Sequence, residues 1–209
     1  MYTAKTPRIV KALYRDLVWK ISTPDPVLFL TFDDGPVPEV TPKVLEILKQ
    51  YNAKATFFCI GDNVKKHPEI YRQILEEGHR TGNHSFNHLN GWKTKNAVYY
   101  RNIFKCSEEV NSALFRPPYG KITRSQSAKL KNRFSIIMWD VLSGDFDRSA
   151  TKEKCLQNVI QSASPGSIIV FHDSIKAADK MLYALPKVLS HYSSIGFSFP
   201  ALPERIPVK

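Results

Sequence analysis

Val27-Leu-Phe-Leu-Thr-Phe-Asp-Asp-Gly-Pro36 joins a short run of apolar strand formers to two adjacent carboxylates. Residues 27–32 predict a buried β-strand, and the Asp-Gly-Pro sequence after them predicts a turn. Thr41-Pro42 predicts the start of a helix, because Thr is a good N-cap and Pro suits the first helical position. This segment therefore predicts a strand, a turn with two acids and a helix.

The same unit recurs along the rest of the chain. Further strands are expected at residues 55–60, 79–83, 114–115, 134–141, 167–171 and 196–199. Helices are expected at residues 69–77, 96–113, 123–130, 151–162 and 178–191, with Pro186 kinking or interrupting the last one. Strands that alternate with helices favour parallel strands joined by helical crossovers. About seven units fit the length, so we expect an α/β fold, a single-domain distorted (β/α)7 barrel.

Composition supports one soluble domain. The chain has 209 residues, of which 43% are hydrophobic and 23% charged, as in ordinary globular proteins. The formal net charge is +11, but the cations are scattered and match no nucleic-acid module, so we expect no nucleic-acid partner. Cys59, Cys106 and Cys155 are odd in number and far apart, which predicts buried thiols and favours a reducing compartment.

Residues 1–24 are expected to form a helical extension, with the main domain over residues 25–209. The apolar residues of this segment follow a helical period and are interrupted by charges. We expect no signal peptide and no transmembrane segment, hence a cytoplasmic location by default, with action at the cell envelope as the alternative. The favoured interpretation is a helix packed on the domain. The alternative is a cationic helix that contacts a membrane surface.

The residues able to do chemistry follow the predicted strands. They are Asp33, Asp34, His84, His88, Arg116, Asp145, His172 and Asp173. In barrel-like folds the carboxyl ends of the strands converge on the active site. Residues that are distant in sequence are therefore expected to share one pocket.

His84 and His88, four residues apart, can face one metal ion if a carboxylate from Asp33 or Asp34 completes the set. An isolated pair of this spacing is weak evidence, and a solvated Asp-Gly turn would explain the acids equally well. Arg116-Pro-Pro-Tyr-Gly120 is a stiff segment that could present Arg116 and the Tyr119 N–H, or form only a strand exit. His172 ends an apolar strand, where it could be a general acid or a satisfied core histidine.

Five segments together resemble the NodB-homology polysaccharide deacetylases, carbohydrate esterase family 4, over roughly residues 27–199. In order, they are Thr31-Phe-Asp-Asp-Gly-Pro36, His84-Ser-Phe-Asn-His88, Arg116-Pro-Pro-Tyr-Gly120, Asp140-Val-Leu-Ser-Gly-Asp-Phe146 and Val170-Phe171-His172. The resemblance implies a metal-dependent hydrolase that removes N-acetyl groups from an acetylated glycan.

The resemblance also implies a role for each site residue. Asp34, His84 and His88 would hold one divalent metal ion, zinc first, with cobalt, nickel or iron as alternatives. Asp33 would be the general base, oriented by Arg116. The Tyr119 N–H would stabilise the oxyanion, and His172, oriented by Asp145, would protonate the amine. Phe146 and Val170 would line the pocket, and both depart from the family, which often has Trp and Leu there.

Two other functions are compatible with the same residues. An O-acetyl esterase, or an amidohydrolase acting on a non-sugar amide, would use the same oxyanion chemistry. An inactive carbohydrate-binding relative would have to lack catalytic groups, and each motif group is present in this sequence.

Overall fold

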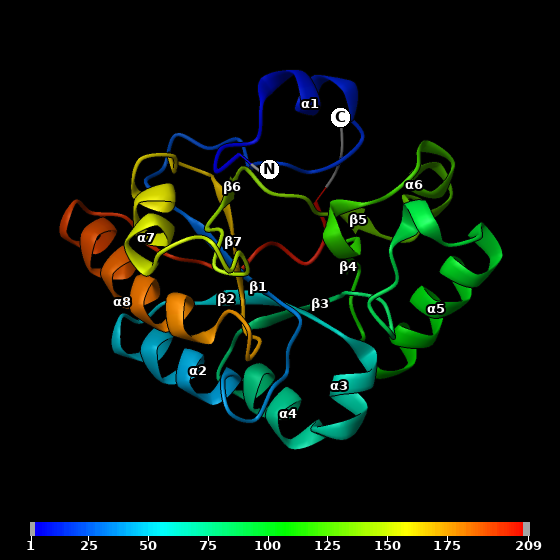
Figure 1. Cartoon of the computed structure of the whole chain (residues 1–209), viewed down its shortest axis with the longest axis horizontal. Helices are drawn as coiled ribbons and strands as arrows, with labels where there is room; N and C mark the ends of the chain where they lie inside the picture. The colour runs from blue at the N-terminus through cyan, green and yellow to red at the C-terminus, as the bar shows by residue number, and fades with distance from the viewer. Residues whose placement is uncertain (1–2, 207–209) are drawn as a thin grey trace.

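The computed structural model describes residues 3–206, and a sheet of parallel strands forms its centre (Figure 1). Within those residues the sheet has seven strands in the order β5-β4-β3-β2-β1-β7-β6. The strands are β1 (Phe29–Asp33), β2 (Ala55–Cys59), β3 (Arg80–Asn83), β4 (Leu114–Phe115), β5 (Ser135–Ile136), β6 (Val141–Leu142) and β7 (Ile168–His172). Every neighbouring pair is parallel, as the alternation of strands and helices predicts.

Helices surround this sheet (Figure 1). They are α1 (Arg8–Leu13), α2 (Thr41–Gln50), α3 (Gly61–Lys66), α4 (Pro68–Glu76), α5 (Asn96–Glu109), α6 (Arg124–Leu130), α7 (Lys152–Ile160) and α8 (Ala178–Ser194), with 3-10 turns η1 (Gly91–Lys93) and η2 (Pro118–Gly120). Of the two predicted effects of Pro186, the interruption is wrong because α8 runs through this residue, and the kink stays a prediction. Within the described part of the chain, no helix combines the length and the apolar composition needed to cross a membrane.

The middle of the sheet is buried on both faces, which holds the strand ends in place. All residues of β1 and β2 are buried. Phe32 of β1 stacks on Phe57 of β2 and Phe171 of β7, with ring centroids 5.0 and 6.0 Å apart. The three cysteines are buried and free, as predicted. Because parallel strands covered on both faces pack this tightly, the residues at their carboxyl ends are well positioned.

The predicted strand at residues 134–141 is wrong as a single element. Its two ends are separate short strands, β5 and β6, which lie at opposite edges of the sheet. The predicted strand at residues 196–199 contributes only a bridge between Val27 and Ser198.

The N-terminal segment lies between these two edges (Figure 1). The Val18 N–H donates to the Ile136 carbonyl, and the Met138 N–H donates to the Val18 carbonyl. On the other edge, the Leu142 N–H donates to the Ala4 carbonyl. The helical period expected up to residue 21 is therefore interrupted after α1, because the following backbone pairs with the sheet.

Candidate active site

The carboxyl ends of the strands bring most of the predicted residues into one cavity of about 420 Å³. Its lining includes the predicted residues Asp33, Asp34, His84, His88, Tyr119, Phe146, Val170 and His172. Arg116 and Asp145 lie behind this lining, where both are fully buried. The expectation that residues distant in sequence share one pocket is therefore met.

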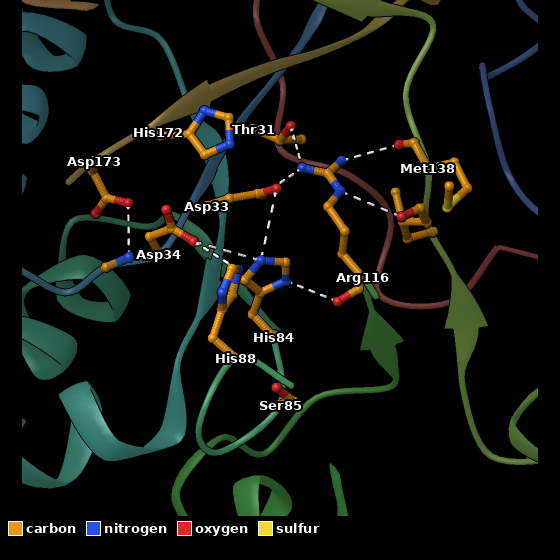
Figure 2. A network of polar contacts seen from close by, with 12 residues as sticks. Thr31, Asp33, Asp34, His84, Ser85, His88, Arg116, Met138, His172 and Asp173 are labelled. Atoms are coloured by element: carbon orange, nitrogen blue, oxygen red, sulfur yellow. Dashed lines mark hydrogen bonds and ion pairs between the residues drawn. The ribbon is translucent and has the colours of Figure 1, made fainter. Parts of the chain in front are cut away.

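Asp33 and Arg116 form a buried ion pair at the centre of the site (Figure 2). Arg116 Nη1 lies 2.6 Å from Asp33 Oδ1 and also donates to Thr31 Oγ1 at 2.8 Å. The other two nitrogens donate to backbone carbonyls, Nη2 to Met138 at 3.1 Å and Nε to Ile137 at 3.3 Å. The guanidinium plane also lies over the Phe58 ring. These contacts fix the guanidinium, and it in turn fixes the Asp33 carboxylate at the cavity surface.

Asp34, His84 and His88 present one carboxylate oxygen and two imidazole nitrogens to each other (Figure 2). Asp34 Oδ1 lies 3.7 Å from His84 Nε2 and 3.2 Å from His88 Nε2. This oxygen is buried and accepts no hydrogen bond from residues 3–206. A buried carboxylate oxygen without a donor, facing two imidazoles, fits a bound cation, and one carboxylate with two imidazoles suits zinc.

The protonation of these ligands suits a metal. His84 Nδ1 lies 2.8 Å from the Arg116 carbonyl, which can only accept, so Nδ1 carries the hydrogen and Nε2 is free. Burial lowers the pKa of His84 to about 4, which keeps the ring neutral at neutral pH. Burial alone would raise the pKa of Asp34, but three neighbouring imidazole rings outweigh it and hold this pKa well below its usual range.

The two histidines come from a loop rather than from a helical turn. Ser85 and His88 have positive φ values, 62° and 56°. The Asn83 side chain accepts a hydrogen bond from the Ser85 N–H at 2.8 Å, and Ser85 Oγ accepts one from the Leu89 N–H at 3.2 Å. These side-chain contacts turn the backbone so that both rings face Asp34.

His172 and Asp145 form the second ion pair of the site. Asp145 Oδ1 lies 2.8 Å from His172 Nδ1, and Asp145 Oδ2 accepts the backbone N–H of the same histidine at 2.7 Å. Burial alone would lower the pKa of His172, but the Asp145 carboxylate outweighs it and raises this pKa to about 9. Phe146 packs edge-on against the ring, with centroids 5.3 Å apart. The imidazole is therefore protonated at neutral pH and held at one angle.

Tyr119 lies in η2 and lines the same cavity. Its φ is 60°, and its ring lies 4.5 Å from the ring of His88. The residue is 59% exposed and lines the cavity, so its ring packs against His88 at the edge of the site while part of it meets solvent.

Sequence reasoning assigned no role to Asp173, which anchors the Asp33–Pro36 turn. Asp173 Oδ1 accepts the Gly35 N–H at 3.0 Å, and Oδ2 accepts the Thr41 hydroxyl at 2.7 Å. A Cβ on Gly35 would lie 2.0 Å from Asp173 Oδ2, so this turn needs glycine. Thr41 is thus not the predicted N-cap but the first residue of α2. The sequence signal that could have identified Asp173 is its position directly after a buried strand.

Sequence reasoning also missed part of the cavity wall. Gly120, Trp139, Leu142, Ser174 and Lys176 line the cavity as well. These residues lie in or beside the motifs, but none has a spacing that distinguishes it from core or surface residues.

The fold and the site define a barrel-like α/β protein with a candidate metal centre at the carboxyl ends of its strands. The family model described as "Polysaccharide deacetylase" matches residues 20–133. The chain belongs to this family.

Relatives and solved structures support the same assignment. A peptidoglycan-N-acetylglucosamine deacetylase from Bacillus cereus is 37% identical over 83% of this chain, which spans 66% of that relative. A second enzyme of that name from the same organism is 32% identical, covering 92% of this chain and 94% of the relative. The structure of the Bc1960 peptidoglycan N-acetylglucosamine deacetylase superposes with a TM-score of 0.88 at 32% identity, covering 98% of each chain. This likeness confirms the predicted distorted barrel.

Proposed function

We propose that this protein is a metal-dependent deacetylase that hydrolyses the N-acetyl groups of N-acetylglucosamine-type glycans, such as peptidoglycan or chitooligosaccharides, to amine and acetate. One observation carries the proposal. Asp34, His84 and His88 share one cavity with a carboxylate supported by Arg116 and a protonated imidazole supported by Asp145. Amide hydrolysis needs a base and an acid on opposite sides of the scissile bond, and this cavity has both.

Asp34, His84 and His88 hold the metal ion, which we assign as zinc. When bound, a divalent ion lowers the pKa of water towards ~7 and polarises the acetyl carbonyl. Asp33 takes the proton of the attacking water, because Arg116 occupies one carboxylate oxygen and leaves the other facing His84. The Tyr119 N–H donates to the carbonyl oxygen as negative charge develops on it.

His172 completes the reaction. The bond from the water oxygen to the acetyl carbon forms, and then the carbon–nitrogen bond breaks as His172 gives its proton to the departing nitrogen. Asp145 keeps the imidazole charged and oriented until that step. Val170 and Phe146 contact the acetyl group from the cavity wall. The products are a free amine on the sugar and acetate.

We also propose that residues 25–209 form the deacetylase domain and residues 1–24 an extension of it. The outermost residues of these two ranges, 1–2 and 207–209, lie outside the described structure.

Acetate release tests the function directly. The protein is stripped with a chelator, reloaded with zinc and assayed on chitotetraose, on peptidoglycan glycan strands and on acetylxylan. We expect acetate from the N-acetyl substrates only with metal present. His88→Ala should abolish release, whereas His191→Ala, an exposed histidine of α8, should not. Absence of acetate from every N-acetyl glycan with zinc bound would overturn the proposal, and release from acetylxylan alone would assign an O-acetyl esterase.

A further inference from the structure

Helix α1 (Arg8–Leu13) carries apolar side chains on two different faces. Val10 and Tyr14, four residues apart, are partly buried and pack against the hydrophobic core of the domain. Ile9 and Leu13 have the same spacing, but they are 69% and 58% exposed. Residues four apart lie on one side of a helix, so these two form a single strip, which we call the Ile9–Leu13 strip. A helix that is apolar on both faces is expected to be covered on both faces.

Contacts on either side of α1 attach it to the domain. Before and within the helix, the Thr6 N–H donates to the Asp140 carbonyl, and Lys11 pairs with the Asp140 carboxylate. After it, the Trp19 indole donates to the Tyr14 carbonyl at 2.9 Å. A helix of six residues would not be stable alone in water, so the domain holds it in shape. The strip is therefore ordered before it meets any partner, and binding carries no cost for folding it.

Basic residues surround the Ile9–Leu13 strip. Residues 3–20 contain five Lys or Arg residues and one acid. Two of these cations pair with the buried Asp140. Arg8 and Arg15 are exposed, and neither forms an ion pair with another of the residues 3–206. The outer surface of the segment is therefore apolar in its centre and positively charged at both ends.

This combination fits an anionic lipid surface. Apolar side chains enter the boundary between headgroups and acyl chains, while guanidinium groups bind lipid phosphates. A nucleic acid would offer phosphates but no apolar surface to the Ile9–Leu13 strip. A second copy of the chain would offer an apolar surface, but a two-fold contact would bring Arg8 and Arg15 of both copies together, and like charges repel.

We propose that α1 binds the surface of an anionic lipid bilayer, with Ile9 and Leu13 at the interface and Arg8 and Arg15 on lipid phosphates. The inference goes beyond the proposed function and does not depend on it. The contact is peripheral, because the other face of α1 stays packed on the domain. It is also reversible and sensitive to salt, because two apolar residues and two cations form a small binding surface.

Co-sedimentation of the full chain with lipid vesicles tests the proposal. The vesicles contain phosphatidylcholine alone or mixed with phosphatidylglycerol, and we expect binding only to the anionic mixture at low salt. Leu13→Ser should weaken binding about tenfold, because an apolar side chain no longer leaves water. Arg8→Gln should weaken it about fivefold, which corresponds to about 1 kcal/mol for one basic residue near an anionic surface.

Helix α4 supplies matched controls, and it lies on the opposite side of the molecule from α1 (Figure 1). Leu75 of α4 is 46% exposed, and Arg72 of the same helix is exposed as well. Leu75→Ser and Arg72→Gln therefore make the same chemical changes away from the strip, and both should bind vesicles as the wild type does. Urea unfolding of each variant checks that the substitution leaves the fold intact.

The outcomes decide between the strip and its alternatives. Absence of binding to the anionic vesicles would overturn the proposal. Equal losses in Arg8→Gln and Arg72→Gln would also overturn it, because the net charge of the whole chain would then explain the attraction. Sedimentation equilibrium without lipid is the last check. A dimer that Leu13→Ser dissociates would assign the strip to a second copy of the chain and would overturn the membrane contact.

Discussion

Two buried ion pairs support the catalytic cavity, and they present partners of opposite charge to it. On one side, Asp33 pairs with Arg116 at 2.6 Å, and on the other, His172 pairs with Asp145 at 2.8 Å. Both pairs lie where strands end, since Asp33 and His172 are register partners in β1 and β7. Each pair joins a carboxylate to a cation in a buried setting.

The pairs differ in which partner faces the cavity. The Arg116 side chain is 0% exposed and has donors engaged with Thr31 and two backbone carbonyls, so Asp33 is the partner available to the cavity, as its proposed role as base requires. On the other side, Asp145 is 0% exposed and His172 is 16% exposed. A buried cation behind a carboxylate thus suits the proposed base, and a buried carboxylate behind an imidazole suits the proposed acid.

Asp33→Asn should give the largest effect, because it removes the proposed base and leaves Arg116 buried without a carboxylate. Turnover should fall by about 10²–10⁴-fold. The free energy of unfolding should fall by about 3 kcal/mol. Acetate release and urea unfolding measure the two effects. Zinc content is the control, since Asp34, His84 and His88 are unchanged and should still bind one ion. A variant that kept the wild-type rate would remove Asp33 from the mechanism.

Asp145→Asn tests the opposite side and should have a smaller effect, because the imidazole remains. Burial lowers the pKa of His172, and without the Asp145 carboxylate the largest contribution that raises it to about 9 is lost, so this pKa should fall. Turnover near pH 8 should fall about 10²-fold and recover partly at lower pH, as the ring becomes protonated.

The same change should alter the pH dependence of stability. In the metal-free wild type, a raised folded pKa contributes stability that is fully present below pH 6.5 and is lost as the pH rises to about 9. Asp145→Asn should lack this loss of stability between pH 6.5 and 9. Histidine NMR titration and urea unfolding at several pH values check both points. An unchanged His172 titration would contradict the assignment.

The site was predictable from the sequence to a greater extent than its surroundings. Asp33 and His172 end their strands and His84 follows one, and convergence of strand ends places them together without knowledge of the loops. The wall residue Trp139 was not predictable, because its position depends on a missing Cβ at Gly120 and on the N-terminal segment. Contacts of that kind depend on tertiary structure and leave no periodic pattern.

The fold shows the same limit at residues 134–141. The apolar run Phe134–Met138 is typical of one strand, and single-sequence patterns record burial rather than which neighbour supplies the hydrogen bonds. In the structure the Met138 N–H bonds to Val18, and the Thr6 N–H bonds to Asp140. The N-terminal segment thus divides the predicted strand into β5 and β6.

Asp140→Asn should have the smallest effect on turnover, and it extends the comparison to a third buried carboxylate. Asp140 is fully buried, but its cations, Lys5 and Lys11, come from the N-terminal segment and neither lines the catalytic cavity. In the first two ion pairs, one partner faces the catalytic cavity. Neither lysine of the Asp140 contacts does so, and we therefore expect these contacts to support stability rather than chemistry. We expect a loss of about 1–3 kcal/mol in the free energy of unfolding at pH 7. The rate on a two-unit substrate should fall less than in either cavity variant.

The pH dependence of this loss identifies its source. Burial alone would raise the pKa of Asp140, but hydrogen bonds from Lys11, Lys5 and Ser167 outweigh it and lower this pKa from 3.8. A depressed carboxyl pKa gives stability that is present above the unfolded value and lost as the pH falls through the folded value. The difference between wild type and Asp140→Asn should therefore shrink below about pH 3.8. Faster amide hydrogen exchange at Thr6 and Leu142 would show that stability is lost where the N-terminal segment pairs with β6. A variant with intact protection there but reduced turnover would mean that Asp140 acts on the cavity, which would contradict this expectation.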